Sequence, residues 1–262
     1  MKTTLYWFSG TGNTLKAARL LAERLGDCEL KPIMGELAGE RIELTGDRVG
    51  ICFPLYFLSF PKPVMDFLAR MENPSAIPLF AVVTRGFTPM GGVLWPFKKA
   101  CRLKRTDLTG LFYLDMPNND VTLFDLESEA VVVTKMSKLP AEIERVSASI
   151  ASGRKKYDFE PLGWVRPFRH KPAYLNHLKE FGKKFTVGDS CVGCGICSKV
   201  CPVGNIQPEN GKPVWGARCV LCEACLNWCP ERAVQFAEAT GHKGRYTCAG
   251  ISSQDISLQK SV

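Results

Sequence analysis

The sequence has none of the long apolar runs that characterise membrane-spanning or secreted proteins. No stretch of its 262 residues approaches the about eighteen consecutive apolar residues that suggest a membrane helix. The apolar run near the N-terminus ends at Gly10 and Gly12 after about six residues, so it is too short for the core of a signal peptide. We therefore expect a soluble, cytoplasmic protein with no membrane span.

Histidine and recognisable nucleic-acid-binding motifs are also scarce. The three histidines, His170, His177 and His242, all lie outside the first 150 residues, and we expect them to be structural or surface residues. A nicotinamide-binding fingerprint and an obvious acid that would act on a substrate are missing as well. The absence of a nucleic-acid-binding motif leads us to expect no nucleic-acid partner.

The positive charge is concentrated in one segment. Of the net charge of +8, five units fall in residues 151–190, which hold nine Lys and Arg against four Asp and Glu. The basic residues of this segment include Arg154, Lys155, Lys156, Arg166, Arg169, Lys171, Lys183 and Lys184. The simplest interpretation is a solvated linker; the alternative is a docking face for an acidic redox partner or an anionic surface, reached by long-range steering.

The first 150 residues alternate strand-like and helix-like segments. Apolar β-rich runs predict strands at 3–8, 48–53, 79–84 and 110–116, with a further short strand at 28–33. Helical spacing of apolar residues predicts helices at 14–25, 62–71 and 92–103, and helical material at 126–152 that is interrupted at Pro140. This alternation predicts an α/β fold with a parallel sheet and right-handed crossovers.

Composition divides the chain into four parts. We expect an α/β domain at 1–152, a basic and aromatic linker at 153–185, a cysteine-rich domain at 186–240, and a polar, irregular tail at 241–262. The cysteine-rich part is too short and too poor in apolar residues to build a sufficient core. Bound cofactors must therefore help to hold it together.

Eight of the twelve cysteines form an internal repeat. Its two runs share the spacing C-x2-C-x2-C-x3-C-P and are offset by 28 residues. This is the pattern of two-cluster ferredoxins, in which the fourth cysteine of each run binds the other 4Fe–4S cluster. One cluster is predicted on Cys191, Cys194, Cys197 and Cys229, and the other on Cys219, Cys222, Cys225 and Cys201. Structural zinc sites are the alternative, but they need no third cysteine at the next two-residue gap.

A glycine- and hydroxyl-rich loop joins the first predicted strand to the first predicted helix. The loop consists of Ser9, Gly10, Thr11, Gly12, Asn13 and Thr14. Its amides and hydroxyls can surround a phosphate dianion at a helix N-terminus. A P-loop would need a lysine here, and a dinucleotide fingerprint would need a third glycine where Leu15 stands. The loop therefore predicts the phosphate of FMN, with an ordinary tight turn as the alternative.

Two further loops follow predicted strands. They are Pro54, Leu55, Tyr56 and Phe57, and Thr84, Arg85, Gly86 and Phe87. Ligands of such sheets bind beyond the carboxyl ends of the strands, so we expect both loops to flank a flavin ring. Tyr56 or Phe57 is a candidate to stack on the ring, or else part of ordinary packing. Arg85 is a candidate to stabilise the anionic reduced flavin, or else an ordinary surface arginine.

These motifs resemble two known families. The stretch Ser9-x2-Gly12-x-Thr14-x3-Ala18-x2-Leu21 resembles the flavodoxin signature, and the cysteine repeat resembles the bacterial two-cluster ferredoxins. The whole chain resembles the flavodoxin–ferredoxin fusion proteins of anaerobes, also called EFR-type ferredoxins. The stretches that carry this wider resemblance are 53–57, 116–119, 211–215 and 244–246.

The resemblance implies a doubly wound, parallel, five-stranded sheet of order 2-1-3-4-5, followed by a small α+β domain with two clusters. It also implies that Asn118 and Asn119 lie near the flavin edge. The expected function is electron relay between FMN, two 4Fe–4S clusters and protein redox partners, with the oligomeric state left open, a homodimer included. The alternatives are a flavin-dependent reductase of a small quinone or enoate, and a redox sensor.

Overall fold

The N-terminal half of the chain is a parallel sheet with helices on both faces. The computed structural model describes residues 1–87, 92–160, 178 and 180–260. Its six-stranded sheet has the order β2-β1-β4-β6-β7-β8, and every neighbouring pair is parallel. The strands are β1 (Thr3–Trp7), β2 (Cys28–Pro32), β4 (Arg48–Pro54), β6 (Leu79–Arg85), β7 (Leu108–Asp115) and β8 (Lys156–Tyr157).

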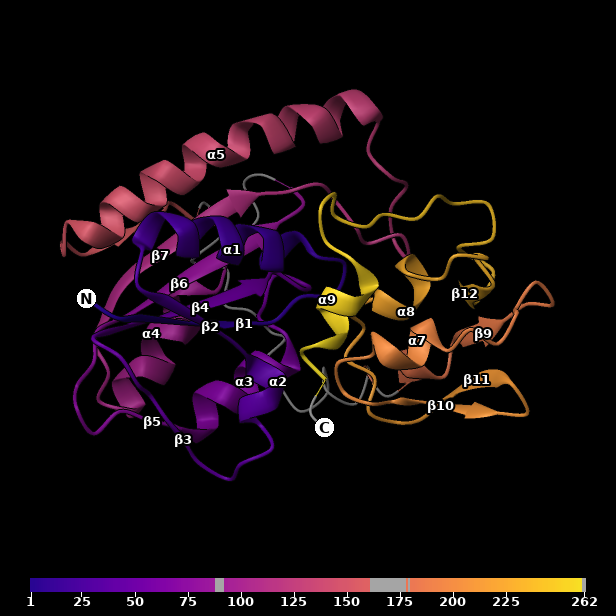
Figure 1. The fold of residues 1–262 in the computed structure, drawn as a ribbon, viewed down its shortest axis with the longest axis horizontal. Helices are drawn as coiled ribbons and strands as arrows, with labels where there is room; N and C mark the ends of the chain where they lie inside the picture. The colour runs from indigo at the N-terminus through magenta and orange to yellow at the C-terminus, as the bar shows by residue number, and fades with distance from the viewer. Residues whose placement is uncertain (88–91, 161–177, 179, 261–262) are drawn as a thin grey trace.

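Two helices cover each face of this sheet. Helices α1 (Asn13–Leu25) and α5 (Glu129–Ala151) lie on one face, and α3 (Lys62–Arg70) and α4 (Leu94–Leu103) lie on the other (Figure 1). The smaller elements are α2 (Ile33–Glu36) and the parallel pair of β3 (Ile42–Glu43) with β5 (Met71–Glu72). This arrangement confirms the predicted doubly wound α/β fold.

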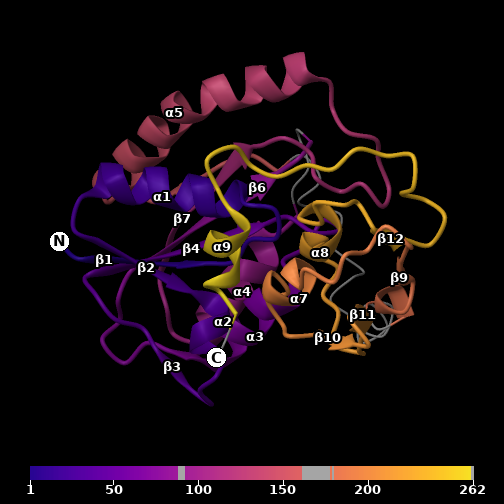
Figure 2. The ribbon, with the colours of Figure 1, turned by 45° about the vertical axis from the view of Figure 1, so that its right-hand side comes forward.

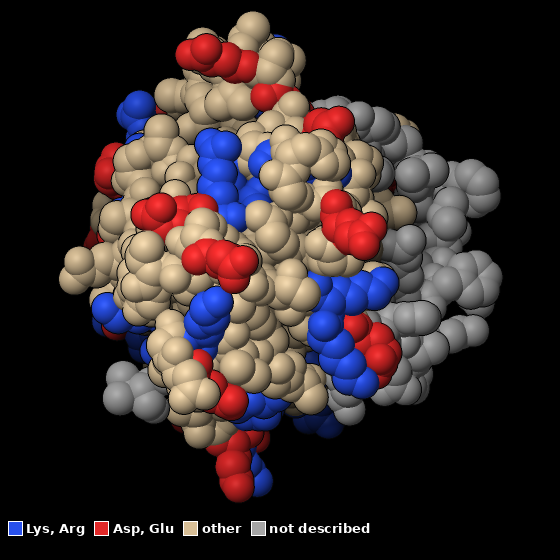
Figure 3. Space-filling view, turned by 90° about the vertical axis from the view of Figure 1, so that its right-hand side faces the viewer, with Lys and Arg blue, Asp and Glu red and all other residues tan. Residues whose placement is uncertain are grey.

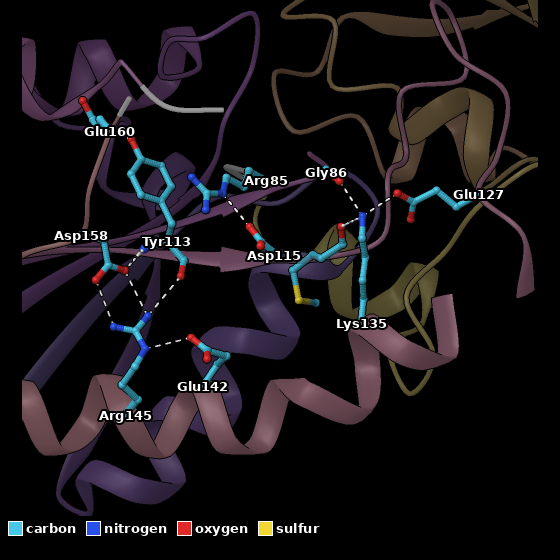
Figure 4. Close-up of polar contacts among 11 residues, drawn as sticks. Arg85, Gly86, Tyr113, Asp115, Glu127, Lys135, Glu142, Arg145, Asp158 and Glu160 are labelled. Atoms are coloured by element: carbon cyan, nitrogen blue, oxygen red, sulfur yellow. Dashed lines mark hydrogen bonds and ion pairs between the residues drawn. The ribbon is translucent and has the colours of Figure 1, made fainter. Parts of the chain in front are cut away.

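The order of the five main strands confirms the predicted 2-1-3-4-5 topology. A sixth strand, β8, adds two residues to the β7 edge, inside the segment that we expected to be linker. The guanidinium of Arg145 fixes this segment, because it donates to both carboxylate oxygens of Asp158 at 3.0 Å (Figure 4). Asp158 also accepts a hydrogen bond of 2.8 Å from the backbone N–H of Tyr113 in β7. A two-residue strand leaves no periodic pattern from which to predict it.

The central strands are buried on both faces. All residues from Val49 to Phe53 in β4 and from Leu79 to Val83 in β6 are buried. Parallel strands that are covered by helices on both sides are near-continuous apolar runs of this kind. The sheet is therefore a rigid base that presents the loops at its carboxyl edge.

The prediction that Pro140 interrupts the last helix is wrong. Helix α5 runs without a break from Glu129 to Ala151 and contains Pro140. Proline removes one helical hydrogen bond, but this helix buries Leu139, Ile143 and Val146 against the core. The packing of this apolar stripe outweighs the lost bond.

The cysteine-rich region forms a second, small module. It contains β9 (Phe185–Val187), α7 (Ile196–Lys199), β10 (Ile206–Glu209), β11 (Lys212–Trp215), α8 (Ala224–Asn227) and β12 (Val234–Phe236). Strand β9 pairs with β12 and β10 with β11, both antiparallel. An aromatic cluster packs between the pairs, with Phe185 5.0 Å from Phe236 and 5.9 Å from Trp215 between ring centroids.

The prediction of an irregular tail is wrong for five of its residues, while the rest of its described part has no helix or strand. The tail contains the short helix α9 (Ser253–Ser257), which lies between the sheet module and helix α7 (Figures 1 and 2). A capping box between Ser252 and Asp255 starts this helix. Hydrogen bonds from Ser252 and from Arg19 of α1 lower the pKa of Asp255 to about 2. Capping and this ion pair stabilise a segment that is too short and polar to be predicted as a helix.

Part of the predicted linker lies outside the described residues. Residues 161–177 and 179 belong to this part, and so do Arg166, Arg169, Lys171, His170 and His177. Within the described part, Lys155 pairs with Asp107 at 2.6 Å, and His242 is exposed. None of the helices in the described ranges is long and apolar enough to cross a membrane. The domain boundaries at 152, 185 and 240 stay predictions.

Candidate cofactor sites

A cavity of about 380 Å³, here the large cavity, lies where the carboxyl edge of the sheet meets the cysteine-rich module. Its volume is within the usual range for a small-molecule site. Gly12, at the N-terminus of α1, is the one residue of the predicted flavin set that does not line it. The predicted residues that do are Ser9, Gly10, Thr11, Asn13, Thr14, Pro54, Leu55, Tyr56, Phe57, Thr84, Arg85, Gly86, Phe87, Asn118 and Asn119.

The loop between β1 and α1 is buried and partly without internal partners. The side chains of Ser9, Thr11 and Thr14 belong to residues that are at most 2% exposed, and the hydroxyl of Thr14 lies 2.7 Å from that of Thr84. Within the described residues, the backbone N–H groups of Gly10 and Thr11 donate to no other protein atom. Such N–H groups beside a helix N-terminus form a site that suits an anion.

A strained turn borders the cavity after β4. Tyr56 and Ser59 exchange two backbone hydrogen bonds of 2.9 and 2.8 Å, so Phe57 and Leu58 are the central residues of a tight turn. Both have left-handed backbones, with φ of 50° and 59°. For non-glycine residues this conformation costs on the order of 1–3 kcal/mol each, and such strain is concentrated at functional sites. The turn directs Phe57 toward the core of the cysteine-rich module, where it packs.

One half-buried lysine connects the two loops that follow β6 and β7. The ammonium of Lys135 donates to the carbonyl oxygen of Gly86 at 2.5 Å and to that of Met116 at 3.2 Å (Figure 4). It also pairs with Glu127 at 2.5 Å, and the other carboxylate oxygen of Glu127 accepts from the N–H of Asn118 at 3.2 Å. Lys135 and Glu127 therefore hold the loops of the large cavity, although neither residue was predicted from the sequence.

The guanidinium of Arg85 is largely buried and is held by an acidic and an aromatic neighbour. Its Nε lies 2.6 Å from Asp115 Oδ1, and the group stacks over the ring of Tyr113 at 4.4 Å from the centroid. Burial, with a smaller contribution from the neighbouring carboxylate of Glu160, raises the pKa of Tyr113. Because Asp115 balances much of its charge, Arg85 offers the cavity less positive charge than a free arginine would.

The loop after β7 contains a buried side-chain amide whose N–H group has no acceptor among the described residues. Asn118 is 5% exposed, and among the described residues its side-chain Nδ2 has no hydrogen-bond acceptor. Asn13 fixes the start of this loop by donating from its own Nδ2 to the carbonyl oxygen of Pro117 at 2.8 Å. A buried donor is rarely left unpaired, so Asn118 fits a ligand that brings an acceptor into the large cavity.

The cysteine-rich module forms another wall of the large cavity. Leu221, Cys222 and Glu223 line it, and sequence analysis assigned none of them to this site. Burial, and secondarily the neighbouring carboxylate of Asp120, raises the pKa of Glu223 well above its usual range. No local signal in the sequence places this cysteine run beside the β1–α1 loop, because the contact joins segments more than 200 residues apart.

The eight repeated cysteines surround two smaller cavities. Cys191, Cys194, Cys197 and Cys229 line the outer cysteine cavity, and Cys201, Cys219, Cys222 and Cys225 line the inner one. Each set thus contains three cysteines of one run and the fourth of the other, as the spacing predicts. In the part of the chain that the structure describes, no three such side chains converge to hold a single metal ion. The cysteines are arranged around cavities rather than around a point.

The two cysteine cavities differ in exposure. Cys194 is exposed, whereas Cys201, Cys222 and Cys225 are buried. Burial raises the pKa of the inner thiols, Cys222 and Cys225 among them, in the absence of a metal. The face of the molecule on the cysteine-rich side carries interspersed acidic and basic side chains on a largely uncharged surface (Figure 3). The outer cavity is therefore the one within reach of another protein.

Comparison with known proteins supports the iron–sulfur part of this description. Residues 190–234 match the family described as a 4Fe-4S dicluster domain. An uncharacterized ferredoxin of Methanocaldococcus jannaschii is 31% identical over 78 residues, which cover 28% of this chain and 39% of the relative. The chain thus spans less than half of the length of that curated relative.

Comparison with solved structures gives partial matches to flavodoxins. A flavodoxin of Streptococcus pneumoniae TIGR4 is 15% identical, with a TM-score of 0.35, and the match covers 56% of this chain and 99% of that one. A flavodoxin from the domain Archaea is 15% identical, with a TM-score of 0.31 and the same coverage of each chain. The strand order of this chain is itself the flavodoxin-like one. The protein therefore combines a flavodoxin-like sheet module with a ferredoxin-type 4Fe–4S module.

Proposed function

We propose that this protein relays electrons between a flavin and two 4Fe–4S clusters, and through them to external redox partners. The observation that carries the proposal is that Cys222 lines both the inner cysteine cavity and the large cavity. When bound, a flavin exchanges electrons singly or in pairs, while each cluster exchanges one at a time. Because the two cavities share a wall, a flavin in the large cavity and a cluster in the inner cysteine cavity would lie next to each other.

The residues of the large cavity fit FMN. The N–H groups of Gly10 and Thr11, with the hydroxyls of Ser9 and Thr14, would hold its terminal phosphate. The unpartnered Nδ2 of Asn118 would donate to an acceptor on the ring. Tyr56 and Phe57 line the same cavity, and Tyr56 would pack on the ring, because Phe57 packs against the cysteine-rich module. These residues together favour a flavin with one phosphate over a dinucleotide.

The cysteine sets fit two clusters that differ in their access to partners. Cys191, Cys194, Cys197 and Cys229 would hold the outer cluster, and Cys201, Cys219, Cys222 and Cys225 would hold the inner one. Exposure of Cys194 supports a docking site for a redox protein over the outer cluster. We place the chain itself in the cytoplasm, where its cysteine thiols would stay reduced and available to iron.

Cofactor analysis of anaerobically purified protein tests this function. We expect about eight irons, about eight sulfides and one FMN per chain. We also expect a reduced ferredoxin-type donor to reduce the flavin more slowly in Cys194→Ser, which alters the outer cluster, than in the wild type. Stoichiometric zinc, or about half of the iron, would contradict the proposal.

A second candidate function is reduction of a small organic acceptor at the flavin. Three apolar side chains stay exposed at the large cavity: Phe87 at 36%, Leu123 at 60% and Phe124 at 41%. The rings of Phe87 and Phe124 contact each other at 5.0 Å between centroids. Because the lining also contains the carboxylate of Asp120, these residues favour an uncharged quinone over an anionic enoate. Steady-state turnover of a quinone, with a matched enoate as control, tests this candidate.

A further inference from the structure

The second cysteine run departs from the first at two positions that face the large cavity. In the 28-residue repeat, Gly193 corresponds to Leu221 and Gly195 to Glu223. The backbone is left-handed at all four positions, with φ of 70° and 73° at the glycines and of 52° and 56° at Leu221 and Glu223. Glycine adopts this conformation freely, whereas other residues are strained in it. The second run thus keeps side chains where its own geometry favours glycine.

The side chain of Glu223 binds the loop that follows β7. Its residue is 5% exposed, and its Oε2 accepts a hydrogen bond of 3.0 Å from the backbone N–H of Val121. Its Oε1 accepts one of 3.0 Å from the hydroxyl of Thr122. Asn227, one turn further along α8, adds a bond of 3.3 Å from its Nδ2 to the carbonyl oxygen of Asn119. The second cysteine run therefore holds the same loop that presents Asn118 to the large cavity.

The same run also contacts the β1–α1 loop. A Cβ atom placed on Gly10 would lie 2.3 Å from the carbonyl oxygen of Cys222, so the two backbones touch. The indole N–H of Trp228 donates to the carbonyl oxygen of Gly10 at 3.1 Å. Two of the loops that face the large cavity are thus fixed by one short peptide that also contains cysteines of the inner cavity.

We propose that the second cysteine run is a wall of the flavin site and that Glu223 is its positioning residue. Glu223 holds residues 119–122 so that Asn118 meets the flavin. This inference rests on the proposed function, because it assumes that FMN occupies the large cavity. It explains why a strained, non-glycine residue stands where the first run has glycine.

Glu223→Gly tests the inference, because it gives the second run the residue that the first run has at the equivalent position. We expect the iron and sulfide content to stay at the wild-type level and the dissociation constant of FMN to rise about tenfold or more. Glu223→Gln should bind FMN nearly as tightly as the wild type, because the amide can accept from Val121 and donate to Thr122. A purely steric role predicts the same difference between these two variants. Thr122→Val separates the two roles, because it removes a hydrogen bond to Glu223 and leaves the volume of both side chains almost unchanged.

Asn210→Gly is the matched control. Asn210 is exposed and has a left-handed φ of 50°, so this variant makes the same type of change in the same module, away from the large cavity. It should bind FMN as the wild type does. If Glu223→Gly loses its clusters, Thr122→Val removes one of the same hydrogen bonds from outside the cysteine run and should also weaken FMN binding.

The outcomes separate the inference from the function on which it rests. If the wild-type protein is purified without FMN and also fails to bind added FMN, the proposed function itself is contradicted. If the wild type binds FMN and Glu223→Gly binds it with the same affinity, the role of Glu223 is overturned. Where Glu223→Gly loses iron, an unchanged FMN affinity in Thr122→Val overturns it. Equal weakening by Glu223→Gly and Glu223→Gln would also overturn it.

Discussion

The side-chain amide of Gln259 forms a paired hydrogen bond with the backbone of Ser9, 250 residues earlier in the chain. Its Oε1 accepts from the N–H of Ser9 at 3.2 Å, and its Nε2 donates to the carbonyl oxygen of Ser9 at 2.6 Å. Both residues are buried. The N–H of Cys248 likewise donates to the carbonyl oxygen of Thr11 at 2.9 Å. The tail therefore fixes the loop that we assign to the FMN phosphate.

Gln259→Ala should loosen this loop. The substitution leaves a buried N–H and a buried carbonyl oxygen of Ser9 without partners, at a cost of about 1–3 kcal/mol each. We expect a lower melting temperature and weaker FMN binding, measured by thermal denaturation and by fluorescence titration with FMN. Gln254→Ala is the control, because Gln254 is an exposed glutamine of helix α9, five residues before Gln259 in the same tail. Equal effects of the two substitutions would show that the tail does not support the loop.

The sheet and the positions of its loops could be predicted because their causes are local. Each buried strand is an apolar run that ends at a turn signal, and parallel strands bring their carboxyl ends to one edge. The grouping of four cysteines around each of two cavities could be predicted for the same reason, because the spacing of the cysteines is short and regular. Local patterns therefore led to the residues around the large cavity.

The residues that fix those loops could not be predicted in this way. Lys135 meets Gly86 across 49 residues, and Gln259 meets Ser9 across 250. Neither residue belongs to a motif, since a lysine in a helix or a glutamine near a terminus is ordinarily a surface residue. Tertiary packing also decided the continuity of α5, against the local preference of Pro140.

Cys229→Ala tests the exchange of the fourth cysteines between the two runs. Because Cys229 lines the outer cavity with Cys191, Cys194 and Cys197, we expect the variant to lose or convert the outer cluster only. Electron paramagnetic resonance of the reduced protein should then retain the signal of one cluster. Cys28→Ala, which changes a cysteine of β2 outside both cavities, should retain both signals. Damage confined to the inner cluster would contradict the assignment.

Thr14→Ala tests the phosphate site. The Thr14 hydroxyl, which is buried beside that of Thr84, would donate to the FMN phosphate in a charge-assisted hydrogen bond. Its loss should weaken FMN binding by about one to two decades, or roughly 1.5–3 kcal/mol. The iron content should not change, because the cysteines of both cavities remain.

Riboflavin provides the control for this prediction, because it has the same ring without the phosphate. It should bind to the wild type far more weakly than FMN does, and its affinity should hardly respond to Thr14→Ala. Release of FAD rather than FMN from the purified protein, or equal affinities for riboflavin and FMN, would mean that this loop does not hold a terminal phosphate.

Lys135→Met tests the contact that joins the loops after β6 and β7. The side chains of Lys135 and Glu127 are only 19% and 13% exposed, so removing the ammonium leaves a largely buried carboxylate without its partner. Breaking a buried pair from one side costs about 3–5 kcal/mol. We therefore expect a large fall in melting temperature and weaker FMN binding, because the carbonyl oxygens of Gly86 and Met116 lose their donor at the same time.

The double variant Lys135→Met with Glu127→Gln separates the cost of an unpaired carboxylate from the loss of the contact that joins the two loops. It removes the unpaired carboxylate, so it should recover part of the lost stability, and the coupling between the two sites should be measurable as a non-additive effect. FMN binding should stay weak in the double variant, because the two loops are still not joined. Lys138→Met, an exposed lysine on the same helix, should leave both properties unchanged. Additive effects of the two substitutions would show that Lys135 and Glu127 do not act as a pair.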